Sequence, residues 1–297
     1  MSTLNSKSNR YLLTIIVITS FFIALIFYIL IKTNHSDNLL NNLENSLSTT
    51  KNLFEEQKRY ALSLSILLSQ DKEILNSYLH KNREESFAIV NQKIEALKQL
   101  QNSNFEVQIH NQDLTTYLRS WDLSKKGIAL ASFRQGLVKV KEEKKPLVSI
   151  ELGKRLNIKA ISPLLQNGVF IGSIETIIDF EHLSKELEQK GYTLFVLLNQ
   201  KYLNIATRLQ NNPKYLEYVL VNKADFKNFE NIPLKELKEY GYVSNTNYSF
   251  SYFSYYDLNN NPLGYIFTGI KNAKHIKINN AYEDEQNTQH LHKVTIE

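Results

Sequence analysis

Residues 11–31 have the sequence YLLTIIVITSFFIALIFYILI and decide how the rest of the chain is interpreted. This stretch contains no charged residue, no glycine and no proline. A helix of about 20 apolar residues spans a hydrocarbon layer of ~30 Å, so the stretch predicts a transmembrane helix. The alternatives are a buried core helix and a cleaved signal peptide, but a signal peptide has an apolar run of only ~7–15 residues. No second run of this length follows, so we expect the chain to cross the membrane once.

Charged residues on either side of this stretch predict its orientation. Lys7 and Arg10 precede it, and Lys32 follows it, but Asp37 and Glu44 offset the charge of Lys32. Basic residues favour the cytoplasmic side of a membrane segment. We therefore expect a single pass through the cell inner membrane. Residues 1–10 would lie in the cytoplasm, and the chain from residue 34 onward would be extracytoplasmic, in the periplasm.

The composition restricts the function classes. Hydrophobic residues make up 42% of the 297 residues, which is enough for a packed core, and the net charge of +5 is modest. The absence of cysteine excludes disulfides, thiolate metal sites and cysteine nucleophiles. His290 and His292 form a close pair, but they lie in a polar tail and predict no zinc site. Without a phosphate-binding glycine loop or a nucleophile elbow, we expect no enzyme and no cofactor. Because the basic residues form no stripe, we also expect no nucleic-acid partner.

The region after the membrane stretch is expected to be helical. The first glycine is Gly127 and the first proline is Pro146, and both residue types are costly inside helices. A seam in three-four alternation, typical of an amphipathic or coiled-coil-like helix, comprises Leu40, Leu43, Leu47, Thr50, Phe54, Gln57, Ala61, Leu64 and Leu68. The pattern predicts a helical spine over residues 34–102, interrupted near residues 76–82. The seam predicts a homodimer, or association with a signalling receptor or kinase.

After residue 102 the periodicity changes from helical to alternating, which predicts strands. Over residues 103–179 we expect strands at residues 105–109, 115–118, 147–152, 157–162 and 169–178, with a short helix at 132–143. Asn167-Gly168 is a hairpin-turn signal between the last two strands. Over residues 180–271 we expect helices at 180–189 and 213–221, with strands at 192–198, 203–207, 248–256 and 263–269. Residues 272–297 are expected to form a polar tail. The order of predicted helices and strands indicates an α+β fold with two antiparallel sheet modules in series.

Alternation also separates two faces of the first predicted sheet. The apolar face, expected to pack on the long helix, comprises Phe105, Val107, Ile109, Val148, Ile150, Phe170, Ile174 and Ile178. The polar face comprises Glu106, Gln108, His110, Ser149, Glu151, Lys159, Ser173 and Glu175. One face of an antiparallel sheet is often exposed to water, so the pattern alone leaves open whether this polar face is merely solvated.

Several segments of this region have distinctive sequences: Gln108-Ile109-His110 with Tyr117-Leu118-Arg119, Ser132-Phe133-Arg134, Val148-Ser149-Ile150-Glu151-Leu152-Gly153, and Ile171-Gly172-Ser173-Ile174-Glu175. Together they resemble the double-Cache sensory domain of bacterial methyl-accepting chemotaxis receptors and sensor kinases. The helix at residues 61–81 is similar to the spine of that family, and Pro262-Leu263-Gly264-Tyr265 is similar to its second module. The resemblance implies that the spine continues from the transmembrane helix and carries a membrane-distal and a membrane-proximal PAS-like (Cache) module.

The resemblance also implies that loops cover the polar face of the distal module and enclose a small ligand. The candidate ligand-binding residues are His110, Tyr117, Arg119, Trp121, Asp122, Arg134, Glu151, Lys159 and Glu175. Arginine donors match a carboxylate, and an indole face can cover an apolar or cationic group. Arg119-x-Trp121 is similar to a pair that amino-acid-binding receptors of the family use. An organic acid or an amino acid is therefore the expected ligand.

The expected function is that of a membrane-anchored extracytoplasmic sensor. Ligand binding in the distal module would send a conformational shift through the long helix or to a partner signalling protein. Family members normally continue into an effector domain, and we expect none within residues 1–297. The alternatives are a tethered solute-binding protein that presents its ligand to a transporter or kinase, and the N-terminal part of a truncated chemoreceptor.

Overall fold

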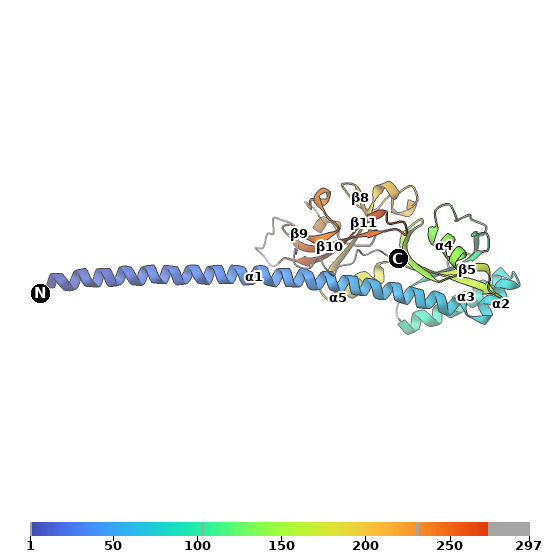
Figure 1. Ribbon diagram of the computed structural model, residues 1–297, viewed down its shortest axis with the longest axis horizontal. Coiled ribbons are helices and arrows are strands. Elements are labelled where there is room, and N and C mark those ends of the chain that lie inside the picture. The colour runs from blue at the N-terminus through green and yellow to red at the C-terminus, as the bar shows by residue number, and fades with distance from the viewer. Residues whose placement is uncertain (1, 102–103, 230–231, 273–297) are drawn as a thin grey trace. The chain divides into compact units, whose positions relative to one another are not determined.

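The computed structural model describes residues 2–101, 104–229 and 232–272. The chain divides into two units, residues 1–45 and residues 46–297. Helix α1 begins at Ser2 and ends at Ser69, so it contributes to both units (Figure 1). Among the described residues, one segment, Leu13–Leu30, is long and apolar enough to cross a membrane, with a mean hydropathy of 2.7 and no buried residue. The predicted apolar helix is confirmed, while its place in a membrane stays a prediction.

Two shorter helices follow α1: α2 (Lys72–Leu79) and α3 (Arg83–Gln101). The Asp71 carboxylate accepts hydrogen bonds of 3.0 and 3.1 Å from two backbone N–H groups in the first turn of α2. Such an N-cap satisfies donors that have no partner within the helix, and it fixes where α2 begins. An interruption was expected at residues 76–82. Only residues 80–82 interrupt the helices, because α2 continues to Leu79 and α3 begins at Arg83.

The first sheet has five antiparallel strands in the order β2-β1-β5-β4-β3. The strands are β1 (Glu106–Asn111), β2 (Thr116–Arg119), β3 (Leu147–Leu152), β4 (Leu156–Gln166) and β5 (Val169–Ile178). Helix α4 (Gln135–Glu143) packs on one face of this sheet, and α1–α3 lie on the other side (Figure 1). Asn167 and Gly168 join β4 to β5 with φ values of 50° and 75°, which confirms the predicted hairpin turn.

The second sheet has six antiparallel strands in the order β7-β8-β6-β11-β10-β9. The strands are β6 (Thr193–Asn199), β7 (Lys214–Tyr215), β8 (Tyr218–Leu220), β9 (Tyr240–Ser244), β10 (Tyr248–Tyr256) and β11 (Pro262–Lys271), and α5 (Glu181–Gln189) precedes them. Two predictions are wrong here. Residues 203–207 form no strand, and residues 213–221 form the β7–β8 hairpin instead of a helix.

The seam of α1 is buried against the two sheets of its own chain. Its buried members in the second unit are Leu47, Thr50, Phe54, Gln57, Ala61, Leu64 and Leu68. Hydroxyl pairs along the helix join both sheets: Ser46–Ser251 at 2.7 Å, Thr50–Thr268 at 2.6 Å and Ser65–Ser162 at 2.9 Å. The prediction that this part of the seam pairs with a second helix is wrong, because the chain's own strands occupy it. A homodimer would have to use another face.

Phe170 was expected on the apolar face but lies on the side of α4. It belongs to an apolar cluster beneath that helix, together with Ile161. The register explains the difference: Leu165 pairs with Phe170 but Leu164 pairs with Gly172, so β5 has one extra residue at this point. An extra residue moves the side chains that precede it to the opposite face of a strand.

Candidate functional site

The polar face of the first sheet is buried beneath α4 and the segment that leads into it. The exposed fractions of its side chains are 3% for Gln108, 0% for His110, 1% for Ser149, 7% for Glu151, 3% for Lys159, 0% for Ser173 and 0% for Glu175. Glu106, at the margin, is part-exposed and pairs with Arg155 at 2.6 Å. The interpretation of this face as simply solvated is therefore wrong. Burial of so many polar groups in one place requires internal partners, or a ligand.

Arg134 lies at the centre of this polar cluster. Its Nε donates to Glu151 at 2.8 Å, and its two terminal nitrogens donate to the Glu175 carboxylate, Nη1 at 3.4 Å. Burial alone would raise the pKa of Glu175, but Arg134, with smaller contributions from His110 and Lys159, holds it well below its usual range. Both carboxylates are thus bound to one guanidinium, which is 3% exposed.

His110 is fully buried beside Glu175. Its Nδ1 lies 3.0 Å from the Ser173 hydroxyl, and its Nε2 lies 3.5 Å from a Glu175 oxygen. Nε2 makes no hydrogen bond with any part of the chain that the structure describes. Burial lowers the pKa of His110, although Glu175 opposes this effect. The imidazole is therefore neutral, with one ring nitrogen able to meet a ligand.

Lys159 is a buried cation with few partners. Its ammonium donates one long hydrogen bond, 3.4 Å, to the carbonyl of Leu152. Its backbone pairs with Ser149 on one side and Ile177 on the other, so both flanking positions on the sheet lack an acidic side chain. Burial, with repulsion from Arg134, lowers the pKa of Lys159 to about 8, although attraction by Glu175 and Glu151 opposes this effect. A buried ammonium that still holds its proton at neutral pH is favourable only when an anion meets it.

Arg119 and Trp121 lie together at the edge of the cluster. The Arg119 guanidinium is 5.6 Å from the centre of the Trp121 ring, and its Nε donates to Gln108 at 3.2 Å. Trp121 is 37% exposed. The Asp122 carboxylate is exposed and accepts hydrogen bonds from the backbone and hydroxyl of Ser124 in its own loop. The structure therefore brings Arg119 to the cluster and leaves Trp121 and Asp122 at its rim.

The expectation that Tyr117 lies over the polar face is wrong. Its hydroxyl lies 3.2 Å from that of Ser86 on α3, and its ring packs edge-on against Tyr78 of α2, with ring centres 4.9 Å apart. The β1–β2 pairing shifts register between Ile109 and His110, and β2 turns Tyr117 toward the helices. Tyr117 thus belongs to the helical side of the first sheet.

Three residues of the cluster were not predicted from the sequence as ligand-binding residues. The Ser149 hydroxyl donates to Glu151 at 2.8 Å, and Ser173 is the partner of His110. Gly136, in the first turn of α4, is the third, because a Cβ there would lie 1.9 Å from a Glu151 oxygen. A glycine two residues after Arg134, inside a predicted helix, was the signal that could have identified this close approach.

Comparison with known families assigns this fold. Residues 36–266 match a double-Cache family described as the double sensory domain of two-component sensor kinase. The chain belongs to this family. A double sensory domain is a ligand-binding class of domain and not a class of enzyme. The resemblance identified from the sequence is therefore confirmed, and the buried polar cluster lies within the first sheet of a double sensory domain.

Solved sensor domains share this fold. The extracellular domain of a protein described as the histidine kinase vpHK1S-Z8 is 15% identical, with a TM-score of 0.50, covering 79% of this chain and 95% of that one. The V. cholerae histidine kinase DctB sensor domain is 13% identical (TM-score 0.49, covering 80% and 99%). The Campylobacter jejuni chemoreceptor Tlp3 domain, solved with L-valine, is 16% identical (TM-score 0.44, covering 82% and 95%). Comparison with curated proteins gives no match.

Proposed function

We propose that this chain is a membrane-anchored extracytoplasmic sensor, without catalytic activity, that binds a small organic acid or amino acid beneath α4. Leu13–Leu30 would be its single membrane pass, with the N-terminus in the cytoplasm. Membership of a sensory family supports the class of function. The observation that carries the proposal is the Lys159 ammonium, which is 3% exposed and has one weak hydrogen bond.

The charges of the polar cluster favour one ligand chemistry. Arg134 and Lys159 balance Glu151 and Glu175, and His110 is neutral. A zwitterion leaves this balance unchanged, because its carboxylate can meet Lys159 while its ammonium meets the two glutamates. A carboxylate without an amine would need the additional positive charge of the part-buried Arg119. We therefore place amino acids first and small carboxylates second.

A thermal-shift panel of amino acids and small carboxylates, added to the full chain in detergent, tests the proposal. A ligand at about 100 times its Kd adds ~2.7 kcal/mol to the folded state, which raises the Tm of a domain of this size by about 5 °C or more. We expect at least one panel member to do so. Arg119→Ala should weaken the shift, because it removes a positive charge from the edge of the cluster. It should leave the fold intact, because Arg119 does not form the centre of the cluster.

Lys125→Met is the matched control, because this lysine is exposed on the loop beyond the cluster. It should retain the full ligand-induced shift. A panel without any stabilising member, or equal shifts in wild type, Arg119→Ala and Lys159→Met proteins, would contradict binding beneath α4.

Two contacts support a route from this cluster to the rest of the second unit. The β3–β4 turn lies next to Lys159, and its Lys154 carbonyl accepts a 2.9 Å hydrogen bond from the backbone N–H of Arg208, just before the second sheet's β7. Ser65 of α1 lies 2.9 Å from Ser162 of β4. An anion that draws Lys159 inward would therefore pull on strands that contact both α1 and the second sheet. We propose this as the path of the conformational signal.

A homodimer, or a signalling partner, would have to contact the face of α1 that its own sheets leave exposed. That face comprises Ser48, Asn52, Glu56, Arg59 and Ser63. Because the chain has no cysteine, single cysteines can be introduced without interference. We expect disulfide cross-links in membranes from Asn52→Cys or Glu56→Cys, and none from the buried controls Thr50→Cys and Ala61→Cys. Absence of cross-links at every exposed position would exclude pairing along this face.

A further inference from the structure

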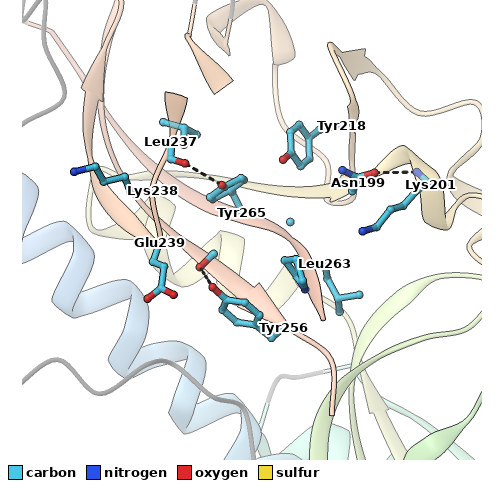
Figure 2. Close-up of a pocket in the computed structure, with 12 residues that line it drawn as sticks. Asn199, Lys201, Tyr218, Leu237, Lys238, Glu239, Tyr256, Leu263 and Tyr265 are labelled. Atoms are coloured by element: carbon cyan, nitrogen blue, oxygen red, sulfur yellow. Dashed lines mark hydrogen bonds between the residues drawn. The ribbon is translucent and has the colours of Figure 1, made fainter. Parts of the chain in front are cut away.

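A cleft of about 350 Å³ opens beside the second sheet, and none of its lining residues belongs to the first sheet. It lies where β6 ends and β11 begins, next to the segment that leads into β9. Its volume is in the range of small-molecule sites, ~300–1,000 Å³, and near the lower end of it. Figure 2 shows the residues around it. We propose that this cleft is a second binding site, for a small carboxylate with a flat ring.

Tyrosine rings form the walls of the cleft. Tyr218 and Tyr265 pack edge-to-face with ring centres 5.7 Å apart, and the Tyr265 hydroxyl donates a long hydrogen bond of 3.4 Å to the Leu237 carbonyl. Tyr256 lies opposite them in Figure 2, and its hydroxyl accepts from Ser254 at 2.9 Å. Ring faces and phenol groups on two sides suit a flat molecule that can accept a hydrogen bond.

The hydroxyls of Tyr218 and Tyr265 remain protonated at physiological pH. Burial raises the pKa of Tyr218 to about 12 and also raises that of Tyr265. These two hydroxyls therefore contribute no negative charge that would repel an anion.

One lysine supplies the charge that selects a carboxylate. In Figure 2, Lys201 extends toward the middle of the cleft, whereas Lys238 points away from it. The Lys201 ammonium also lies 4.9 Å from the centre of the Tyr202 ring, and the Tyr202 hydroxyl donates to the Pro262 carbonyl at 3.1 Å. The exposed Lys201 ammonium therefore lies at the mouth of an aromatic-walled space. A ring in the cleft would leave its carboxylate at Lys201.

Titration calorimetry of the full chain in detergent with 4-hydroxyphenylacetate tests the second site. We expect saturable binding that Lys201→Met weakens about tenfold or more, since a charge-assisted hydrogen bond is lost. Lys223→Met, an exposed lysine of the same region that does not line the cleft, should leave the Kd unchanged. Tyrosol, which has the same ring but no carboxylate, should bind at least about tenfold more weakly than the acid.

The two proposed sites can be distinguished in the same experiment. Lys159→Met should leave the binding of 4-hydroxyphenylacetate unchanged, because Lys159 belongs to the first sheet. Absence of saturable binding, equal affinity in the Lys201→Met protein, or loss of binding on Lys159→Met would each overturn the second site. None of these results would contradict the ligand-induced increase in Tm that is expected from binding at the first sheet, because that increase depends on Arg119 and Lys159.

Discussion

Replacement of Arg134 by methionine is expected to lower the free energy of unfolding by about 3–5 kcal/mol, the cost of leaving buried charges unpaired. In the wild type, one guanidinium neutralises Glu151 and Glu175, which are 7% and 0% exposed. Methionine has a similar length but no donor, so both carboxylates would lose their buried partner. Guanidinium denaturation of the full chain in detergent, followed by the fluorescence of its single tryptophan, Trp121, measures the loss.

Arg155→Met is the matched control for this experiment. Its pair with Glu106 is 33% and 31% exposed, so its removal should cost less than about 1 kcal/mol. Combining Arg134→Met with Glu175→Gln should recover part of the lost stability, since one of the two unpaired charges is then removed. Equal, small effects of Arg134→Met and Arg155→Met would mean that Glu151 and Glu175 have other partners and that Arg134 is not at the centre of the cluster.

Replacement of Lys159 by methionine is expected to raise stability at neutral pH while it abolishes the ligand response. The pKa of Lys159 is lowered from 10.5 to about 8, so the folded state binds this proton more weakly than the unfolded state does. Below pH 8 the charged side chain therefore costs stability, on the order of 1–3 kcal/mol. As pH rises from about 8 to 10.5, the unfolded state alone retains the proton, and wild-type stability should rise relative to the variant.

Thermal unfolding of both proteins from pH 7 to 10.5 measures this difference. Tyrosine ionisation also affects stability at high pH, but it is common to both proteins and cancels in the comparison. We expect the Lys159→Met protein to have the higher Tm at pH 7 and this advantage to shrink above pH 8. A variant that is less stable at pH 7 would show that the ammonium already has a sufficient partner within the chain.

Much of the architecture could be predicted because its periodicity is long and regular. β10 was predicted at residues 248–256 and has those bounds, since aromatic and serine residues alternate over 248–252 and aromatic residues continue to Tyr256. The turn at Asn167 and Gly168 was predicted because this pair readily adopts the positive φ that the hairpin requires. By contrast, β7 and β8 comprise two and three residues, too few to display a period, and the helical interpretation of this stretch was wrong.

The sequence predicted which face of the first sheet carries the candidate site, but it did not predict which side chains pair with one another there. Alternation along β1, β3, β4 and β5 placed His110, Glu151, Lys159 and Glu175 together, and the structure confirms their common face. The pairing of Arg134 with glutamates 17 and 41 residues away depends on how α4 docks, which no local pattern reports. Tyr117 was misplaced because a shift in strand register is invisible in a four-residue strand.

The central claim is that a small ligand binds beneath α4 on the polar face of the first sheet. A crystal structure of the chain with the most stabilising member of the panel tests it directly. We predict that the carboxylate of this ligand lies within hydrogen-bond distance of Lys159 Nζ, with Arg119 beside it. A ligand located outside the first sheet, with Lys159 and Arg134 arranged as they are without it, would contradict the claim.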